Sequence, residues 1–171
     1  MDDLLEIRIG SLLRSGGYKL ASAESCTGGL IGHRLTNVPG SSDYYLGGII
    51  AYAYPAKVAL LGVSWETLRQ YGAVSREVVL EMAQGARQAL EADLAISVSG
   101  IAGPGGALPG KPVGTIWLGL STGEGEWAQV FCFQGDREQN KSFAAQAALQ
   151  LVYDYLCGER SLDVDRREKD L

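Results

Sequence analysis

The residues most able to carry out a reaction stand in the short stretch AESCTGG, where three side chains with nucleophilic atoms follow one another. Ser25, Cys26 and Thr27 offer two hydroxyls and a thiol, and each group can attack a carbonyl carbon once a base removes its proton. An apolar run precedes them and two glycines follow. This pattern predicts a tight turn from a strand into a helix, with Ser25 well placed for attack on a carbonyl.

The start of such a helix is also a place where an anion can bind. The first backbone N–H groups have no partner within the helix, and the positive end of the helix dipole lies beside them. These donors, near Thr27 and Gly28, favour an oxyanion or a phosphate, and Gly28 and Gly29 let a ligand approach the backbone closely. The residues alone favour a simpler alternative, in which Ser25 or Thr27 caps the helix and Cys26 is buried.

A candidate base lies in the stretch YAYPAK, residues 52–57. A lysine at the edge of an apolar segment can lose solvation, which lowers its pKa and frees the amine to accept a proton. Lys57 could then form a Ser–Lys dyad, which needs no histidine. The alternatives are a surface position for Lys57 and simple packing of Tyr52 on a strand. The sole histidine, His33, fits neither a triad pattern nor a metal site built from several histidines.

Two further segments could bind a substrate. The glycine-rich stretch 99–106 follows a predicted strand, as a ligand loop at the carboxyl end of a parallel sheet does, but it matches neither the dinucleotide-binding fingerprint nor the P-loop. Arg137 stands at the start of a predicted helix, one turn before Lys141, where its guanidinium could bind a phosphate or a carboxylate. The alternatives are an ordinary turn and a solvated surface arginine.

These candidates lie in a chain whose hydrophobic periodicity alternates between helix and strand. Helices are predicted over residues 2–15, 27–37, 55–63, 65–71, 76–91 and 137–157. Strands are predicted over residues 18–23, 44–54, 93–102, 113–121 and 126–134, the last two as a hairpin. Ser64 and Ser75 are predicted N-caps, and Asp136 with Gln139 is predicted to form a capping box.

Buried strands that alternate with helices predict an α/β fold, a single three-layer α/β/α domain around a mixed, mostly parallel sheet. The terminal hairpin makes at least one strand antiparallel. We expect this domain to span residues 1–158 and the charge-dense segment 159–171 to be a disordered tail. The strand over residues 44–54 is expected to be buried on both faces near its end.

The composition restricts the classes of function. A chain of 171 residues with 46% apolar and 20% charged residues suits one globular domain. Its formal net charge of −5 disfavours binding to nucleic acid. No signal peptide is recognised, and the most apolar stretch, residues 46–63, is interrupted by Pro55 and Lys57, so no membrane span is predicted. Three widely spaced cysteines without a CxxC pattern predict reduced thiols and a cytoplasmic location.

Several motifs, taken in order, resemble those of one known family. They are AESCTGG, VPGSSDYYLGGIIAY, KxxLLGV, YGAVSxEV with MAxGAR, SGIAGPGG, PVGT and GDR. They follow one another as in the CinA C-terminal domain family, whose characterised members include nicotinamide mononucleotide deamidases. The resemblance implies an amidohydrolase that converts this pyridine nucleotide into nicotinate mononucleotide and ammonia, with no cofactor and no metal. It also implies a homodimer or a larger homo-oligomer.

The resemblance also assigns roles to residues. It implies that Ser25 is the nucleophile and that Lys57 accepts its proton, directly or through Tyr52. Backbone N–H groups near Thr27 and Gly28 are implied as oxyanion donors, and the 99–106 loop and Arg137 as the phosphate site. The full set implied for the oxyanion and substrate is Cys26, Thr27, Gly28, Ser99, Gly100, Gly103 and Arg137.

Two segments depart from the family pattern. Many relatives have Tyr-Ser-Asn or Tyr-Thr-Asn where this chain has Tyr52-Ala53-Tyr54, and commonly an arginine where this chain has Lys141. The first departure leaves open an alternative function, a catalytically inactive module that binds a nucleotide. Deamidation of another pyridine amide and a phosphate-binding interaction role tied to competence or DNA damage are further alternatives.

Overall fold

The structure, a computed structural model, describes residues 4–165. In chain order its elements are α1 (Leu5–Gly16), β1 (Leu20–Glu24), α2 (Leu30–Thr36), the short 3-10 helix η1 (Ser41–Asp43), β2 (Tyr45–Ile50), α3 (Tyr54–Leu61), α4 (Trp65–Tyr71), α5 (Arg76–Ala89), β3 (Leu94–Gly100), β4 (Thr115–Thr122), β5 (Glu126–Cys132), α6 (Arg137–Leu156) and β6 (Val164–Asp165). The predicted alternation of helices and strands is confirmed.

The strands form a single mixed sheet in the order β2-β1-β3-β4-β5-β6. Strand β1 is parallel to both β2 and β3, whereas β4 is antiparallel to β3 and β5, and β6 is parallel to β5. All strands of this sheet except β4 therefore run in one direction. The mostly parallel sheet and the predicted hairpin of β4 and β5 are both confirmed.

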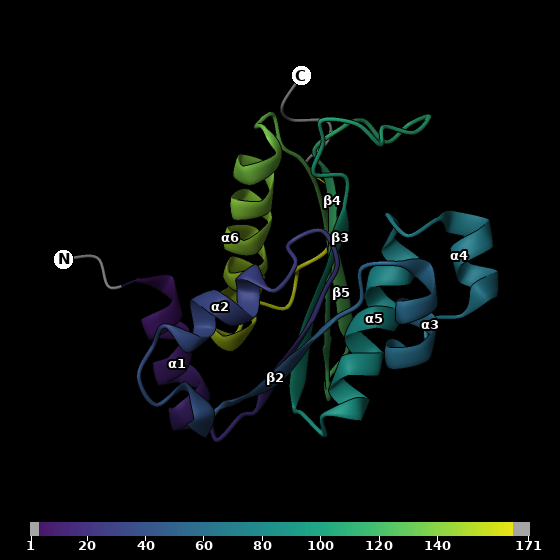
Figure 1. The fold of residues 1–171 in the computed structure, drawn as a ribbon. Coiled ribbons are helices and arrows are strands. Elements are labelled where there is room, and N and C mark those ends of the chain that lie inside the picture. Colours follow the sequence, from purple (N-terminus) through teal and green to yellow (C-terminus); the bar gives the residue numbers. More distant parts are fainter. Residues whose placement is uncertain (1–3, 166–171) are drawn as a thin grey trace.

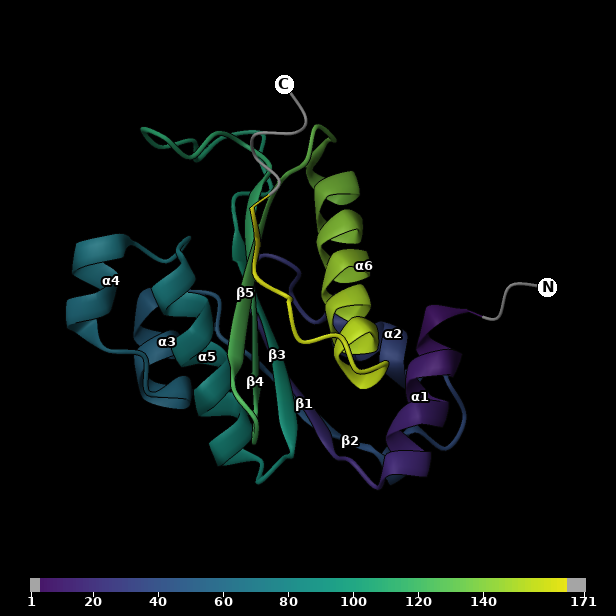
Figure 2. The same cartoon turned by 180° about the vertical axis from the view of Figure 1, so that it is seen from behind.

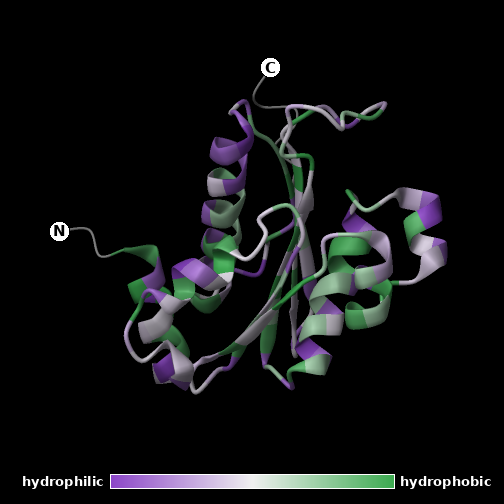
Figure 3. Cartoon of the chain, in the orientation of Figure 1, coloured by the Kyte–Doolittle hydropathy of each residue, from purple (hydrophilic) through white to green (hydrophobic). Residues whose placement is uncertain are grey.

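Helices cover both faces of the sheet, which confirms the three-layer architecture. Helices α1, α2 and α6 lie on one face and α3, α4 and α5 on the other (Figures 1 and 2). Each face has its own hydrophobic core, one including Ile96 of β3 and Leu149 of α6, the other including Ala95 of β3 and Met82 of α5. Helices α3 and α5 are mostly hydrophobic beside the sheet, whereas α4, outside them, is largely hydrophilic (Figure 3).

The helix starts confirm the predicted caps and fix where the helices begin. Ser64 and Ser75 each accept a hydrogen bond from the backbone N–H three residues later, and Asp136 and Gln139 form the predicted capping box. The capping box makes Arg137 the first residue of α6. Helix α2 begins at Leu30 and not at residue 27, so a longer turn separates it from β1.

The second strand differs from its prediction. It spans Tyr45–Ile50 and not residues 44–54, and it is an edge strand of the sheet. Leu46 and Ile50 are 41% and 52% exposed, so the expectation that its end is buried on both faces is wrong. The apolar composition suggested burial, but the helices on the two faces of the sheet leave this edge strand partly uncovered, and none of its residues is fully buried.

The segment that begins at residue 159 also differs from expectation over its described part. Residues 159–165 pack against the domain: Gln129 Nε2 donates to the carbonyl of Leu162 at 2.9 Å, and Leu162 is buried. Strand β6 then pairs with β5. The many charges of this segment predicted disorder, but they flank one apolar side chain that has a place in the core. Residues 166–171, also predicted to be disordered, lie outside the described residues.

Between residues 4 and 165 the structure has neither a membrane-spanning helix nor a cluster of metal-binding side chains. No helix in this range is long and apolar enough to cross a membrane. The same range contains no group of three or more histidine, cysteine, aspartate or glutamate side chains arranged to hold a metal ion.

Candidate active site

The site lies at the carboxyl ends of the three parallel strands β2, β1 and β3. The sheet register places Glu24, the last residue of β1, opposite Ile50 of β2 and Val98 of β3. The residues that follow these three therefore emerge at one edge of the sheet. The chain leaves β1 toward β2 on one side and later returns to β3 on the other, and ligand sites in open α/β sheets occur at such a reversal of strand order.

Two backbone hydrogen bonds hold the start of the turn after β1. The N–H of Ser25 donates to the carbonyl of Val98 at 3.0 Å, and the N–H of Ala51 donates to the carbonyl of Glu24 at 2.9 Å. The backbone of Ser25 is thus fixed between the ends of two neighbouring strands.

Lys57 of α3 meets Ser25 inside the domain. Its Nζ atom lies 2.8 Å from Ser25 Oγ. Pro55 in the first turn suits the start of α3, and a helical side chain leans toward the helix N-terminus, which directs Lys57 back over the end of β2. The expectation that the hydroxyl and the amine share hydrogen-bonding range is met.

The surroundings of Lys57 suit a neutral amine. The residue is 1% exposed, and this burial lowers its pKa from 10.5 to about 8, an effect that the neighbouring Cys26 partly opposes. Nζ also lies 2.8 Å from the carbonyl oxygen of Ala51 and 3.2 Å from that of Tyr52. A neutral amine has two N–H bonds and one lone pair. It can donate to the two carbonyls and accept the hydroxyl proton of Ser25.

The turn between Ser25 and α2 is arranged differently from its prediction. The N–H groups of Gly29, Ile31 and Gly32 donate to the carboxylate of Glu24, and so does the hydroxyl of Thr27. These donors at the helix start are therefore occupied.

The assignment of oxyanion donors changes as a result. The N–H of Gly28 was expected to be free for an oxyanion. It donates instead to the carbonyl of Ser25 at 3.1 Å. The N–H groups of Cys26 and Thr27 donate to no other residue within residues 4–165. These two groups are the donors of the turn that remain for a ligand.

The thiol of Cys26 is in a different environment from the hydroxyl beside it. The side chain is 5% exposed and belongs to the hydrophobic core on the α6 side of the sheet. Burial raises the pKa of the Cys26 thiol to about 12. Because the thiolate is the reactive form of cysteine, this thiol is a poor nucleophile at neutral pH.

Arg137 connects two of the predicted site residues, Tyr52 and Gly103. Its guanidinium donates to the Tyr52 hydroxyl at 2.9 Å and to the carbonyl of Gly103 at 2.7 Å. The Tyr52 side chain is 58% exposed, and Lys57 contacts Ser25 directly. Tyr52 therefore has the position of a residue at the cavity entrance, and the direct contact leaves no need for it to relay a proton.

A cavity of about 250 Å³ joins these groups. Of the residues predicted for the site, those that line the cavity are Ser25, Cys26, Tyr52, Lys57, Ser99, Gly100, Gly103 and Arg137. Thr27 and Gly28 are not among the lining residues. The 99–106 loop thus forms one wall, and residues 73 and 74, which precede α5, contribute a wall that the sequence did not predict.

Three further residues shape the site but were not among the predicted site residues. Glu24 holds the turn, and Asn140, fully buried in α6, donates from Nδ2 to the carbonyls of Ala102 and Gly135 and so fixes the loop. Lys141 lies near the turn: a Cβ added to Gly28 would be 4.0 Å from its Nζ atom. The only sequence signals were a charged residue at the end of an apolar strand and polar residues after GDR.

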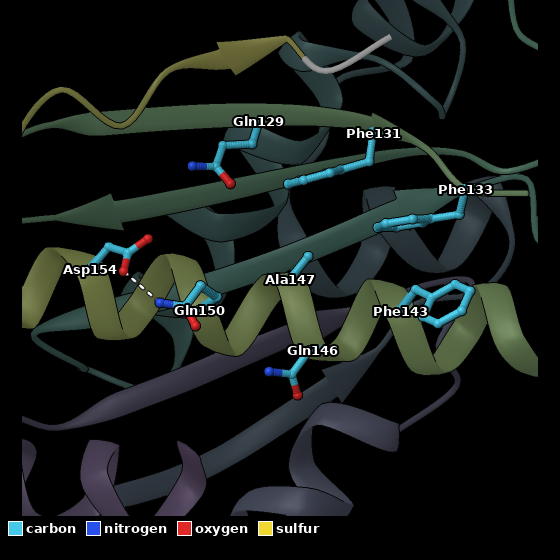
Figure 4. Close-up of a pocket in the computed structure, with 8 residues that line it drawn as sticks. All are labelled: Gln129, Phe131, Phe133, Phe143, Gln146, Ala147, Gln150 and Asp154. Carbon is cyan, nitrogen blue, oxygen red and sulfur yellow. Dashed lines mark hydrogen bonds between the residues drawn. The ribbon is translucent and has the colours of Figure 1, made fainter. Parts of the chain in front are cut away.

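A larger cavity, of about 340 Å³, lies between β5 and α6. Figure 4 shows its aromatic wall, where Phe131 and Phe133 stack with their centroids 5.3 Å apart and Phe143 faces them from α6. The polar residues at its rim are glutamines and Asp154, which accepts a hydrogen bond from Gln150. Its lining includes neither a nucleophile nor a base beside one, so the smaller cavity is the candidate active site.

The domain is thus a three-layer α/β protein with a buried serine–lysine pair at the switch point of its sheet. The CinA C-terminal domain family matches residues 2–156 of the chain. The chain therefore belongs to the CinA C-terminal domain family.

Individual relatives agree with this assignment. The chain is 50% identical over 149 residues to a CinA-like protein of Salinibacter ruber and 46% identical over 154 residues to a CinA-like protein of Desulfotalea psychrophila. These matches cover 87% and 90% of the chain but only 36% and 37% of the relatives. The chain thus spans little more than a third of the length of these curated relatives.

Solved structures show the same fold over nearly the whole domain. Competence damage-inducible protein A of Klebsiella pneumoniae matches with a TM-score of 0.88 and 34% identity, covering 91% of this chain and 97% of that chain. A competence/damage inducible protein of Agrobacterium tumefaciens matches with a TM-score of 0.86 and 37% identity, covering 90% and 93%. The names of these relatives refer to competence and damage and specify no reaction.

Proposed function

We propose that this protein is an amidohydrolase that converts nicotinamide mononucleotide into nicotinate mononucleotide and ammonia. The observation that carries the proposal is the 2.8 Å contact between Ser25 Oγ and the buried Nζ of Lys57 in a cavity of about 250 Å³. A hydroxyl beside a desolvated amine is the arrangement that activates a serine without histidine. The substrate is proposed from the resemblance to deamidases of this family.

The chemistry proceeds in two stages. Ser25 Oγ forms a bond to the carboxamide carbon while its proton moves to Lys57. The N–H group of Cys26, a residue that lines the cavity, stabilises the oxyanion, and such a donor contributes on the order of 3 kcal/mol to the transition state. The C–N bond then breaks as Lys57 returns the proton to the departing nitrogen, which leaves as ammonia. Water then attacks the ester carbon as it gives a proton to Lys57. The bond between this carbon and Ser25 Oγ breaks, Lys57 returns the proton to Oγ, and nicotinate mononucleotide is released.

The charges around the cavity suit the proposed nucleotide. The positive pyridinium ring withdraws electrons from the carboxamide and makes its carbon easier to attack. Lys141 forms no ion pair or hydrogen bond with the part of the chain that the structure describes, so its ammonium is available for the phosphate. The guanidinium of Arg137 keeps hydrogen-bond donors beyond those it uses for Gly103 and Tyr52.

Ammonia release from nicotinamide mononucleotide tests the function. We expect steady release by the wild-type protein, with free nicotinamide a much poorer substrate because it lacks the ribose phosphate. A thermal shift with the mononucleotide and no ammonia would instead support the inactive binding module. Turnover of free nicotinamide at an equal rate would contradict the proposed substrate.

The pH dependence follows from the lowered pKa of Lys57. The neutral amine is the active form, and with a pKa of about 8 only roughly a tenth of the lysine is neutral at pH 7. We expect kcat/KM to rise about tenfold per pH unit below pH 8 and to level off above it. Initial rates between pH 6 and pH 10 measure this. A kcat/KM profile that is flat between pH 6 and pH 9 would contradict the assignment of Lys57 as the base.

The thiol of Cys26 is expected to take no part in the bond-making steps. Because its pKa is raised to about 12, the thiolate is scarce at working pH. Cys26→Ala should keep kcat within about fivefold of the wild type, since only side-chain packing is lost. The check is ammonia release, with circular dichroism to confirm folding. A loss as large as that expected for Ser25→Ala would point to the thiol as the nucleophile.

A further inference from the structure

Glu24 is an unusual residue for its place in the fold. It is the last residue of β1, directly before Ser25, and it is only 1% exposed. No lysine, arginine or histidine forms a salt bridge with it among residues 4–165. A buried carboxylate without a cation is costly unless hydrogen bonds replace its hydration.

Four hydrogen bonds supply that replacement. Oε2 accepts from the Thr27 hydroxyl at 2.6 Å, from the N–H of Gly29 at 3.0 Å and from the N–H of Ile31 at 3.1 Å. Oε1 accepts from the N–H of Gly32 at 2.9 Å. Helix α2 has no cap from its own N-cap residue, Gly29. The carboxylate of Glu24 therefore caps α2 from the end of the preceding strand, and the positive end of the helix dipole favours its charge.

Glu24 fixes both ends of the turn that carries the proposed nucleophile. The backbone of Glu24 belongs to β1, and its side chain holds the first turn of α2, so both ends of the turn that carries Ser25 are fixed to one residue. Within the turn, Gly28 and Gly29 adopt positive φ angles of 63° and 104°, which only glycine adopts readily. The glycines allow the tight turn but do not fix it, and the hydrogen bonds to Glu24 hold its far end.

We propose that Glu24 is a positioning residue for the proposed reaction. Its carboxylate holds the turn so that Ser25 Oγ stays within hydrogen-bonding range of Lys57 and the N–H group of Cys26 faces the developing oxyanion. This inference rests on the proposed function. The carboxylate itself makes no hydrogen bond to Lys57 or to the Ser25 side chain, so it acts through the geometry of the turn.

Glu24→Gln is the sharpest variant because it keeps the shape of the side chain. The amide replaces one acceptor oxygen by an NH₂ group, which would face donors that need an acceptor. Displacement of reacting groups by about 1 Å can cost about 100-fold in rate. We therefore expect kcat for ammonia release to fall about 10- to 100-fold with little change in KM. Ser64→Ala, which removes the cap of the remote helix α4, is the matched control: it should lower the melting temperature without lowering kcat.

Labelling by a fluorophosphonate separates this inference from the choice of substrate. In that reaction Ser25 Oγ bonds to phosphorus, fluoride leaves and the serine proton passes to Lys57, so the rate reports the activated serine alone. We expect the folded Glu24→Gln protein to label about 10- to 100-fold more slowly than the wild type. Wild-type labelling without ammonia release would contradict the substrate while the labelling ratio still decides the role of Glu24.

The outcomes that overturn the inference are equally definite. Labelling of Glu24→Gln at the wild-type rate overturns it. An equally large loss of labelling rate in Ser64→Ala also overturns it, because the loss would then follow the melting temperature and not the geometry of the turn. Should Glu24→Gln fail to fold, Thr27→Val removes one of the four hydrogen bonds and keeps the side-chain volume. That variant is expected to label severalfold more slowly, and an unchanged rate for it also overturns the role of Glu24.

Discussion

Replacing Ser25 by alanine is expected to reduce ammonia release from nicotinamide mononucleotide by about 1,000-fold or more, because no other group can form the covalent bond. The alanine removes one hydroxyl, which within residues 4–165 has a hydrogen-bond partner only in Lys57, at 2.8 Å. The backbone of residue 25 keeps its hydrogen bond to Val98. The fold should therefore survive, as circular dichroism can verify, while the reaction stops.

Ser97→Ala provides the matched control for this experiment. Ser97 is fully buried on the neighbouring strand β3, and its hydroxyl donates to the carbonyl of Val79 and not into the cavity. Its loss should lower stability and leave kcat close to the wild-type value. Near-normal turnover by Ser25→Ala would mean that water or another residue attacks the amide, and the serine mechanism would be abandoned.

Replacing Lys57 by methionine is expected to lower kcat by about 100- to 10,000-fold, the range typical of a lost general base. Methionine has a similar length and fills the same buried space, but it cannot take the proton of Ser25. The loss should persist at every pH between 6 and 10, since the titrating group itself is gone. Lys19→Met, at an exposed lysine outside the cavity, serves as the control and should not change the rate.

Lys57→Arg sharpens the same test. A guanidinium stays protonated at any working pH, so it has donors but no lone pair to accept a proton. If Lys57 is the base, arginine should be as inactive as methionine even though the positive charge is kept. Recovery of most of the activity by arginine would show that the site needs a cation and not a base.

The sequence predicted the architecture of this domain because its elements carry local signals. The capping box at Asp136, the caps at Ser64 and Ser75 and the alternation of apolar strands with helices all appear in the structure as expected. Burial at the sheet edge was harder to predict, because the exposure of Ile50 depends on which strand ends the sheet. Likewise, the high density of charges in the last residues predicted disorder and gave no sign that Leu162 would be buried.

The candidate site shows the same division between local and long-range information. The nearness of Ser25 and Lys57 depends on the parallel pairing of β1 with β2, which residue spacing alone does not fix; the family resemblance pointed to this pair. The support from Glu24 escaped prediction because the cap of α2 comes from a residue before the turn and not from the expected Ser25 or Thr27. A charged residue that ends a fully buried strand was the available signal.

The most direct measurement is a crystal structure of the Ser25→Ala protein soaked with nicotinamide mononucleotide. We expect the carboxamide carbon within about 3.5 Å of the position that Oγ occupies in the wild type, as a near-attack geometry requires. The carboxamide oxygen should accept a hydrogen bond from the N–H group of Cys26, and the phosphate of the nucleotide should lie near Lys141 and Arg137. A nucleotide bound with its carboxamide away from residue 25, for example against Phe131 and Phe133 in the larger cavity, would contradict the proposed mechanism.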